Sequence, residues 1–438
     1  MRMVDVIEKK AARGELSREE IQFVVEGFVS GDIPDYQMSA LMMAIVLNDM
    51  SEREAADLTL SMANSGDTVD LSDLPGVKVD KHSSGGVGDT TTLVVAPLVA
   101  ACGGTVAKMS GRGLAFSGGT IDKLESIPGV NTAQTIERFK QIVRETGVCV
   151  IGQTGNLVPA DKKMYALRDV TGTVESVPLI AASIMSKKLA AGADAIVLDV
   201  KTGSGAFMKT VEDAKRLAGL MVGMGKHLKR DVVAVVTDMN QPLGLAVGNA
   251  LEFREAVQLL SGQLSQGDPL LEVCLLLGTH MLLLAGLARS ESEAREKLQV
   301  AIESGAGLSK LRAMIRALGG DEHLLTPEGM DSLCRVRRLV PVPARESGYV
   351  TGMQAELIGR AAQVLGAGRA TKEDVIDPAV GLVMHKRVGG KIERGEAICT
   401  LYVNDEKNLQ DAISTMQQAI AIGAKPEQVA PMVYAVVR

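Results

Sequence analysis

Short apolar segments alternate with segments of helical periodicity over residues 75–240. Predicted strands cover residues 77–79, 105–109, 148–151, 195–200 and 232–237, and predicted helices between them include 93–101, 132–145, 178–191 and 211–227. Strands separated by helices pair in parallel, and a parallel sheet is covered by helices on both faces. The alternation therefore predicts an α/β fold with a mixed, mostly parallel sheet that binds ligands at the carboxyl ends of its strands.

The flanking segments predict two further units. Residues 1–65 form consecutive helices, because Ser17 with Glu20 and Ser51 with Glu54 have the spacing of a capping box. Residues 252–318 continue as helices, and residues 334–343 alternate like a strand. The expected organisation is a small all-helical lobe (residues 1–65 plus about 160–192), a large α/β lobe (75–155 and 193–330) and a C-terminal α+β domain (331–438).

The first helices carry Met-rich apolar faces, with Met38, Leu41, Met42, Met43, Ile45 and Val46. Such faces are either core or a subunit interface, and the sequence leaves both interpretations open.

Composition excludes several classes of partner. The 438 residues carry a formal net charge of −6 and no basic stripe, and with no Trp, six Phe and five Tyr the chain lacks platforms for stacking bases, so nucleic acid is not expected. Five widely spaced cysteines without a Cys-x-x-Cys pair predict reduced thiols and a cytoplasmic location. Residues 1–16 lack the apolar core of a signal peptide, and no segment is typical of a membrane span.

The run K-H-S-S-G-G-V-G-D-T-T-T at residues 81–92 places a cation, an imidazole, glycines and hydroxyls between a predicted strand and a predicted helix. Glycines allow close backbone approach and a helix start attracts anions, so the run predicts a phosphate site. It matches neither the P-loop nor the Rossmann fingerprint. An ordinary βα turn is the alternative, and the adjacent Lys81 and His82 argue against it.

Two more segments carry candidate chemistry. Residues 110–113 and 117–120 form a second run of glycines and hydroxyls, with Thr120 placed to cap a helix. Ser183 and Lys187 are four residues apart on one predicted helix, with Arg168 upstream, and together they could grip a polar planar group. The alternative is that Lys187 and Lys188 are a solvated helix face. Residues 201–205 are interpreted as an ordinary loop.

Together, the runs at residues 81–92, 110–125 and 168–188 resemble the thymidine and pyrimidine-nucleoside phosphorylase family, and the resemblance covers essentially the whole chain. It implies phosphorolysis of pyrimidine nucleosides such as uridine, deoxyuridine and thymidine to free base and pentose 1-phosphate. It also implies one potassium ion per subunit, no organic cofactor, and a homodimer formed through the N-terminal helices.

The resemblance also assigns residues. His82, Arg168 and Lys187 would be catalytic and would hold the pyrimidine together with Ser183. Phosphate would be held by Lys81, Ser83, Ser84, Gly85, Thr92, Lys108, Met109, Ser110 and Thr120. The ligands of potassium would be Gly88, Thr90, Leu243, Ala246 and Glu255.

These assignments agree with the chemistry. Breaking the glycosidic bond pushes negative charge onto the base, where Arg168 and Lys187 would stabilise it, and His82 would donate a proton or hydrogen bond to a base carbonyl. Phosphate is already an anionic nucleophile, so positioning dominates and the anomeric carbon inverts once. The helical and α/β lobes are expected to close and bring the reactants together.

Two positions bear on details. Residues 115–117 read Ala-Phe-Ser where the family usually has Gly-His-Thr, which puts any cleft-closing role of that histidine in doubt. Lys108 accompanies family members that accept uridine as well as thymidine, so broad pyrimidine specificity is expected.

Two alternative functions stay open at this point. One is an enzyme resembling anthranilate phosphoribosyltransferase, which would need magnesium for a pyrophosphate substrate. The other is a non-catalytic protein that binds nucleoside or phosphate.

Overall fold

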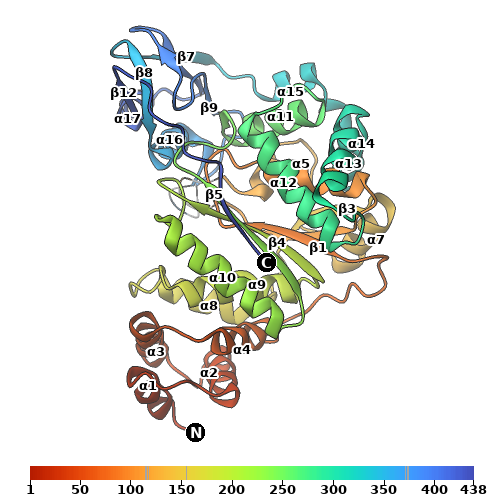
Figure 1. Ribbon diagram of the computed structural model, residues 1–438, viewed down its shortest axis with the longest axis vertical. Coiled ribbons are helices and arrows are strands. Elements are labelled where there is room, and N and C mark those ends of the chain that lie inside the picture. The colour runs from red at the N-terminus through yellow and green to blue at the C-terminus, as the bar shows by residue number, and fades with distance from the viewer. Residues whose placement is uncertain (114–115, 117, 154, 370, 372–373) are drawn as a thin grey trace.

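The computed structural model describes residues 1–113, 116, 118–153, 155–369, 371 and 374–438. Four helices open the chain and lie together at one end of the molecule (Figure 1): α1 (Met3–Ala11), α2 (Arg18–Ser30), α3 (Asp35–Asn48) and α4 (Glu52–Ala63). Both predicted capping boxes are confirmed. The side chains of Ser17 and Ser51 each accept from the backbone N–H three residues later, and the side chain of the Glu at that position accepts from the backbone N–H of the serine. These bonds fix where α2 and α4 begin.

A mostly parallel sheet forms the centre. Strands β1 (Val79–Ser83), β4 (Ala195–Thr202) and β5 (Asp231–Asp238) pair in parallel, and the last strand of the chain, β13 (Val433–Val437), pairs antiparallel with β5. Strands β2 (Val106–Ser110) and β3 (Val148–Gly152) form a second parallel pair, joined to the β1 edge by a parallel bridge between Lys78 and Thr105. The chain thus runs outward from β1 to β3 and returns to β4 on the other side of β1. Ligands bind at such a switch point, here between the carboxyl ends of β1 and β4.

Helices cover both faces of this sheet (Figure 1). On one face α4 packs with α9 (Val177–Ala190) and α10 (Val211–His227) through a shared apolar cluster that includes β4 and β5. On the other face lie α5 (Thr91–Ala101) and α12 (Pro269–Leu284). The remaining helices of this region are α6 (Thr120–Leu124), α7 (Ile136–Thr146), α8 (Pro159–Arg168), α11 (Asn249–Leu260), α13 (Glu291–Glu303), α14 (Ala306–Ala317), η1 (Glu322–Leu324) and α15 (Pro327–Leu333).

The C-terminal unit is α+β. One antiparallel sheet contains β7 (Arg338–Pro343), β11 (Ala397–Val403), β9 (Gly381–Met384) and β6 (Ala246–Val247); another contains β10 (Lys391–Ile392), β8 (Gly348–Met353) and β12 (Ile420–Gly423). The helices here are α16 (Ala355–Ala362), η2 (Gln363–Ala367) and α17 (Leu409–Ala419). The predicted fold class, with helical, α/β and C-terminal α+β parts, is confirmed.

The largest differences from the expected element boundaries are the following. The first strand was placed at residues 77–79, but β1 runs through Ser83 because it pairs in register with β4 to that point. The helix expected from residue 132 begins at Ile136, since the Thr135 side chain caps it. The strand expected from residue 334 begins at Arg338, because Cys334 ends α15.

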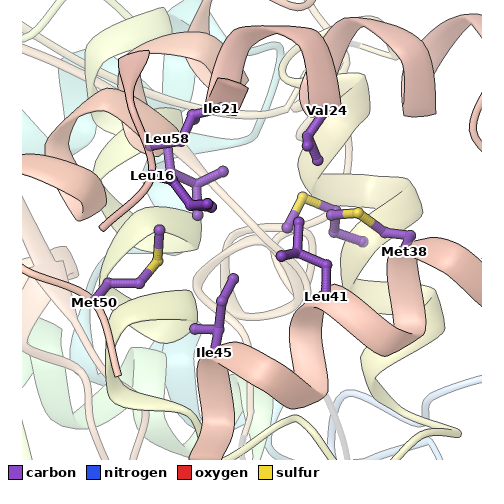
Figure 2. A pocket seen from close by; sticks show the side chains of 9 residues that line it. Leu16, Ile21, Val24, Met38, Leu41, Ile45, Met50 and Leu58 are labelled. Atoms are coloured by element: carbon purple, nitrogen blue, oxygen red, sulfur yellow. The ribbon is translucent and has the colours of Figure 1, made fainter. Parts of the chain in front are cut away.

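The Met-rich face of α3 divides between core and surface. Met38, Leu41, Met42 and Ile45 are buried, whereas Met43 and Val46 are exposed. A cavity of about 10 Å³ remains inside this helical unit (Figure 2), lined by Leu16, Ile21, Val24, Met38, Leu41, Ile45, Met50, Leu58 and Met164. A space of this size and apolar lining belongs to the core and is far too small for a substrate. Within the described part of the chain, no helix is long and apolar enough to cross a membrane.

A buried ion pair joins α1 to α4 within the helical unit. Lys10 Nζ lies 2.8 and 3.0 Å from the two carboxylate oxygens of Glu54, which also accept from the backbone N–H groups of Leu16 and Ser51. Both charged side chains are almost fully buried. Removing one partner of such a pair leaves an uncompensated buried charge.

We therefore expect Lys10→Met to lower the free energy of unfolding by about 3–5 kcal/mol in urea denaturation. The matched control is Lys9→Met, because Lys9 pairs with Glu20 at 2.8 Å in a more exposed position, where the Lys9 side chain is 40% exposed. That control should lose no more than about 1 kcal/mol. Equal losses for the two variants would contradict the argument.

Candidate functional site

Strand β1 sends successive side chains to opposite sides of the sheet, as the pleat of a strand requires. Lys81 points toward α5, where its Nζ donates to Thr91 Oγ1. Asp80 points toward α9, where its Oδ2 accepts from Lys188 Nζ at 2.7 Å. The neighbours Ser83 and His82 continue this alternation. The strand therefore separates the residues expected to bind phosphate from the histidine expected to bind the base.

Asp89 organises the phosphate side. Its carboxylate accepts from the Ser83 hydroxyl at 2.5 Å and from the backbone N–H and hydroxyl of Thr91 at 3.1 and 2.5 Å. Burial by itself would raise the pKa of Asp89, but the charges of Lys81, Lys201 and Lys123 hold that pKa well below its usual value. The loop after β1 thus surrounds a permanently ionised carboxylate at the start of α5.

Two glycines give this loop its shape. Gly85 has a φ of +100° and Gly88 a φ of +63°, in the left-handed region that side chains disfavour. A Cβ on Gly88 would also lie 3.0 Å from the Ala246 carbonyl oxygen. The backbone at Gly88 therefore approaches residues 244–246, at the start of β6, as closely as only glycine allows.

The other residues expected at phosphate lie around the same strand ends. Thr92 is in the first turn of α5, Ser110 ends β2, and the Ser84 hydroxyl accepts from the backbone N–H of Lys201 at 2.8 Å. Thr120 is the first residue of α6, and Gly119 is its N-cap, so the expectation that Thr120 caps the helix is wrong. Ser117 and Ala115 lie outside the described residues, while Phe116 packs partly buried against the core.

Lys108 and Met109 lie deeper, on β2. Lys108 is buried and donates to Asp80 at 3.3 Å and to the Lys81 carbonyl at 2.5 Å. Burial lowers the pKa of Lys108 to about 7, despite the nearby Asp80. The Met109 side chain is buried, and its carbonyl accepts from Lys188 Nζ at 3.4 Å. Lys108 therefore bonds directly to β1, and Met109 bonds to Lys188, which itself pairs with Asp80 of β1.

Helix α9 presents the residues expected at the base. Lys187 Nζ donates to Asp161 at 2.7 Å and to the Ser183 hydroxyl at 3.0 Å. Arg168 is buried, donating to the carbonyl oxygens of Thr173, Val174 and Leu179. Burial lowers the pKa of Arg168. The structure thus brings Ser183 and Lys187 into direct contact and sets Arg168 against the first turns of α9.

The alternative of a solvated helix face is wrong for both lysines of α9. Lys188 is buried against Asp80, and the Lys187 side chain is only 25% exposed. Lys188 was assigned no role from the sequence, and Asp161 was not identified at all.

His82 is surrounded by positive charge. Burial is the main cause that lowers its pKa well below 6.5, and Lys188, Lys108, Lys187 and Lys81 add to the effect. The imidazole is therefore neutral at neutral pH. A neutral imidazole donates one N–H hydrogen bond and accepts another at its second nitrogen.

The residues expected to hold a cation also converge. Backbone bonds from Leu243 N to Val87 O (3.1 Å) and from Gly244 N to Gly88 O (3.0 Å) join the two loops that supply them. Glu255 accepts from the N–H groups of Leu245 and Ala246 at 2.6 and 3.4 Å, and burial raises its pKa to about 7.

The environment of Thr90 Oγ1 indicates whether a cation suits this group of residues. This oxygen is buried without a hydrogen-bond partner among the described residues, and such an orphaned oxygen is unusual. No cluster of three or more His, Cys, Asp or Glu side chains suited to a metal occurs in the described ranges. Carbonyls, one hydroxyl and one carboxylate suit a hard cation of low charge.

Comparison with known proteins decides the family. The family described as "Glycosyl transferase family, helical bundle domain" matches residues 4–66, "Glycosyl transferase family, a/b domain" matches 76–308, and "Pyrimidine nucleoside phosphorylase C-terminal domain" matches 349–423. The chain is 53% identical over 434 residues to the pyrimidine-nucleoside phosphorylase of Geobacillus stearothermophilus, covering 99% of each chain. It is 56% identical over 425 residues to that of Bacillus subtilis strain 168, covering 97% of each.

The chain belongs to the pyrimidine-nucleoside phosphorylase family. A solved structure of anthranilate phosphoribosyltransferase from Thermus thermophilus has a similar fold, with a TM-score of 0.61. That likeness has 19% sequence identity and covers 72% of this chain and 99% of the other, so it shows the fold alone.

Several residues of this family member's site were not identified from the sequence. Lys201 was placed in an ordinary loop, but it lies at the end of β4 and is fully buried 2.7 Å from Asp199. Lys123 pairs with Glu252 at 2.5 Å and donates to the Asp89 carbonyl at 2.6 Å. For Lys201 the available signal was a charged residue directly after the predicted apolar strand 195–200, at the edge where ligands bind.

The environment of His82 predicts a pH dependence. Its pKa lies well below 6.5 in the folded state and near 6.5 in the unfolded state, so below pH 6.5 the unfolded state binds more protons. Folding stability is therefore lost as the pH falls below about 6.5, by up to about 1.4 kcal/mol per pH unit.

The measurement compares urea unfolding at pH 7 and pH 5. His82→Gln should lose less stability between these values than the wild type, and the exposed His323→Gln should behave like the wild type. A His82 imidazole NMR signal that titrates near pH 6.5 would count against the predicted environment.

Proposed function

We propose that this site cleaves the N-glycosidic bond of pyrimidine nucleosides with inorganic phosphate, giving free base and pentose 1-phosphate. The observation that carries the proposal is the alternation on β1, which places Lys81 and Ser83 on one side of the strand and His82 on the other. One strand can thus hold the nucleophile and the leaving group at a fixed separation. Fixed placement of two reactants is a major source of rate enhancement.

On the phosphate side, Lys81, Ser83 and Thr92 are the proposed ligands, with Ser110 from the end of β2 and Thr120 from the start of α6. Ser84 and Gly85 shape the first turn of the loop. Lys81 and the start of α5 supply positive potential, as anion sites at helix starts do. A phosphate oxygen forms the new bond to the anomeric carbon as the bond to the base nitrogen breaks, and the bonding electron pair leaves with the base.

On the base side, Arg168, Ser183 and Lys187 are the proposed ligands, together with His82. Arg168 directs three N–H groups at backbone carbonyls, which leaves two of its five donors for a substrate. Lys187 uses two of its three donors on Asp161 and Ser183, which leaves one. These cationic donors stabilise the negative charge that develops on the base, and neutral His82 donates a hydrogen bond.

Broad pyrimidine specificity is part of the proposal, with uridine, deoxyuridine and thymidine as substrates. It rests on the family resemblance at Lys108, a residue that donates to Asp80 and to the Lys81 carbonyl beside His82.

A potassium ion held by Gly88, Thr90, Leu243, Ala246 and Glu255 is also part of the proposal. The orphaned Thr90 Oγ1 and the buried Glu255 carboxylate support it. The bound ion would neutralise Glu255 and fix the backbone of the loop that carries the phosphate ligands.

We further propose a homodimer and a cytoplasmic location. Large apolar side chains exposed on α1 and α3 support the dimer, namely Val4, Tyr36, Met43, Val46 and Leu47. All five cysteines are free thiols, which is typical of a reducing compartment.

The activity is tested by following release of uracil and thymine from uridine, deoxyuridine and thymidine. We expect release that requires inorganic phosphate and persists in EDTA without any divalent metal. A requirement for magnesium and pyrophosphate chemistry would instead favour an enzyme resembling anthranilate phosphoribosyltransferase. Binding of nucleoside without release of base would favour a non-catalytic protein.

In the same assay, Lys187→Ala should lower kcat/KM about 100-fold, because it removes a cationic donor from the developing charge. Lys226→Ala is the control, an exposed lysine on α10. Circular dichroism establishes that both variants are folded. Near-normal turnover by folded Lys187→Ala would remove Lys187 from the proposed role.

The cation proposal is tested by thermal unfolding in potassium chloride and in lithium chloride of equal ionic strength. Potassium should raise Tm by about 3 °C or more, because an ion that binds only the folded state stabilises it. Glu255→Gln should abolish the rise, and the exposed Glu303→Gln should retain it. Equal Tm values in the two salts would contradict the proposal.

A further inference from the structure

Strand β4 ends with two buried charges that the proposed function has not used. Asp199 and Lys201 are two residues apart and lie on the same side of the strand. Their exposed fractions are 1% and 0%. Asp199 stands directly opposite Ser83 in the parallel pairing of β1 with β4. The pair therefore lies beneath the phosphate side of β1, at the switch point of the sheet.

Asp199 lies much closer to Lys201 than to Lys81. Asp199 Oδ2 lies 2.7 Å from Lys201 Nζ and 3.9 Å from Lys81 Nζ. Asp199 Oδ1 accepts from the Thr237 hydroxyl at 2.6 Å, which holds the carboxylate in place. Lys201 thus makes the closer ion pair, and Lys81 stays at the outer limit of one.

The backbone at the end of β4 also supports the loop. The Lys201 N–H donates to the Ser84 hydroxyl at 2.8 Å, and the Ser84 N–H donates to the Asp199 carbonyl at 2.9 Å. These bonds join the first turn of the phosphate loop to the segment that carries the pair.

Lys201 remains charged in this position. Burial lowers the pKa of Lys201, but the carboxylates of Asp199 and Asp89 outweigh it and raise the pKa above its usual value. A lysine without a charged partner at this depth would lose its proton.

We propose that Lys201 is a positioning residue for inorganic phosphate. By pairing closely with Asp199, Lys201 keeps that carboxylate from forming a close ion pair with Lys81. The Lys81 ammonium group then stays available to the phosphate. The inference rests on the phosphate subsite of the proposed function. Without Lys201, the only cation within ion-pair distance of Asp199 in the described residues is Lys81. A buried carboxylate that loses its closer cationic partner strongly attracts the remaining one.

The test is a double-mutant cycle with Lys201→Met, Asp199→Asn and the double variant, measured by base release from uridine. Lys201→Met should raise KM for phosphate about tenfold and change KM for uridine less than about threefold. The double variant removes the carboxylate as well, so KM for phosphate should return to within about threefold of the wild type. The control is Lys209→Met, an exposed lysine of the same segment, which should match the wild type.

Loss of activity in Lys201→Met without rescue by Asp199→Asn would overturn the inference and leave a purely structural role. An unchanged KM for phosphate in Lys201→Met would also overturn it. A second readout is the rise of Tm on adding inorganic phosphate, which should be diminished in Lys201→Met and restored in the double variant. If the wild type released no base but the three proteins still showed this pattern of phosphate-induced Tm shifts, the proposed function would fail while the inference held.

Discussion

The parallel pairing of β1 with β4 is the constraint on which the rest of the site depends. It holds in register from Val79 opposite Ala195 to Ser83 opposite Asp199, so the polar triplet 81–83 is extended and its side chains alternate. A loop at these positions would leave the orientation of each side chain undetermined. The pairing converts three consecutive residues into two chemically different surfaces, one facing α5 and the other facing α9. It also brings the end of β4 beneath the phosphate loop.

Buried charge is the second requirement, and it is satisfied by pairing. Beneath the site, five lysines (Lys81, Lys108, Lys123, Lys188, Lys201) alternate with four carboxylates (Asp80, Asp89, Asp199, Glu252). Each of these carboxylates lies close to at least one lysine, since an isolated buried ion is strongly destabilising. Burial is the main cause that keeps His82 neutral, and Lys81, Lys108 and Lys188 of this group add to the effect, so part of the charge near the phosphate side also acts on the base side.

Periodicity in the sequence predicted the sheet well where strands are apolar: β2, β3, β5 and α10 lie within one residue of the predicted bounds, and β4 extends two residues further, to Thr202. It misplaced β1 because Lys81, His82 and Ser83 show no apolar alternation, and only the partner strand β4 keeps them extended. It missed Lys201 for a related reason. Burial of that lysine depends on Asp199, two residues earlier, and on Asp89, more than a hundred residues away. The resemblance identified the segment around Arg168, Ser183 and Lys187, but no local pattern could place Asp161 beside Lys187.

The C-terminal unit contacts this arrangement through residues 241–247 of the α/β part, among other segments. Residues 241–247 carry the expected cation ligands Leu243 and Ala246, and several of their partners come from beyond residue 380. Arg387 donates to the carbonyls of Pro242 and Leu243 at 3.0 and 2.8 Å, and β6 pairs with β9. The same segment contacts the phosphate loop through Gly244 N and Gly88 O. A chain of backbone and guanidinium bonds therefore runs from the C-terminal sheet to the loop after β1. The third unit thus fixes the loop after β1 through residues 241–247, while β4 fixes it through the bonds that join Ser84 to Asp199 and Lys201.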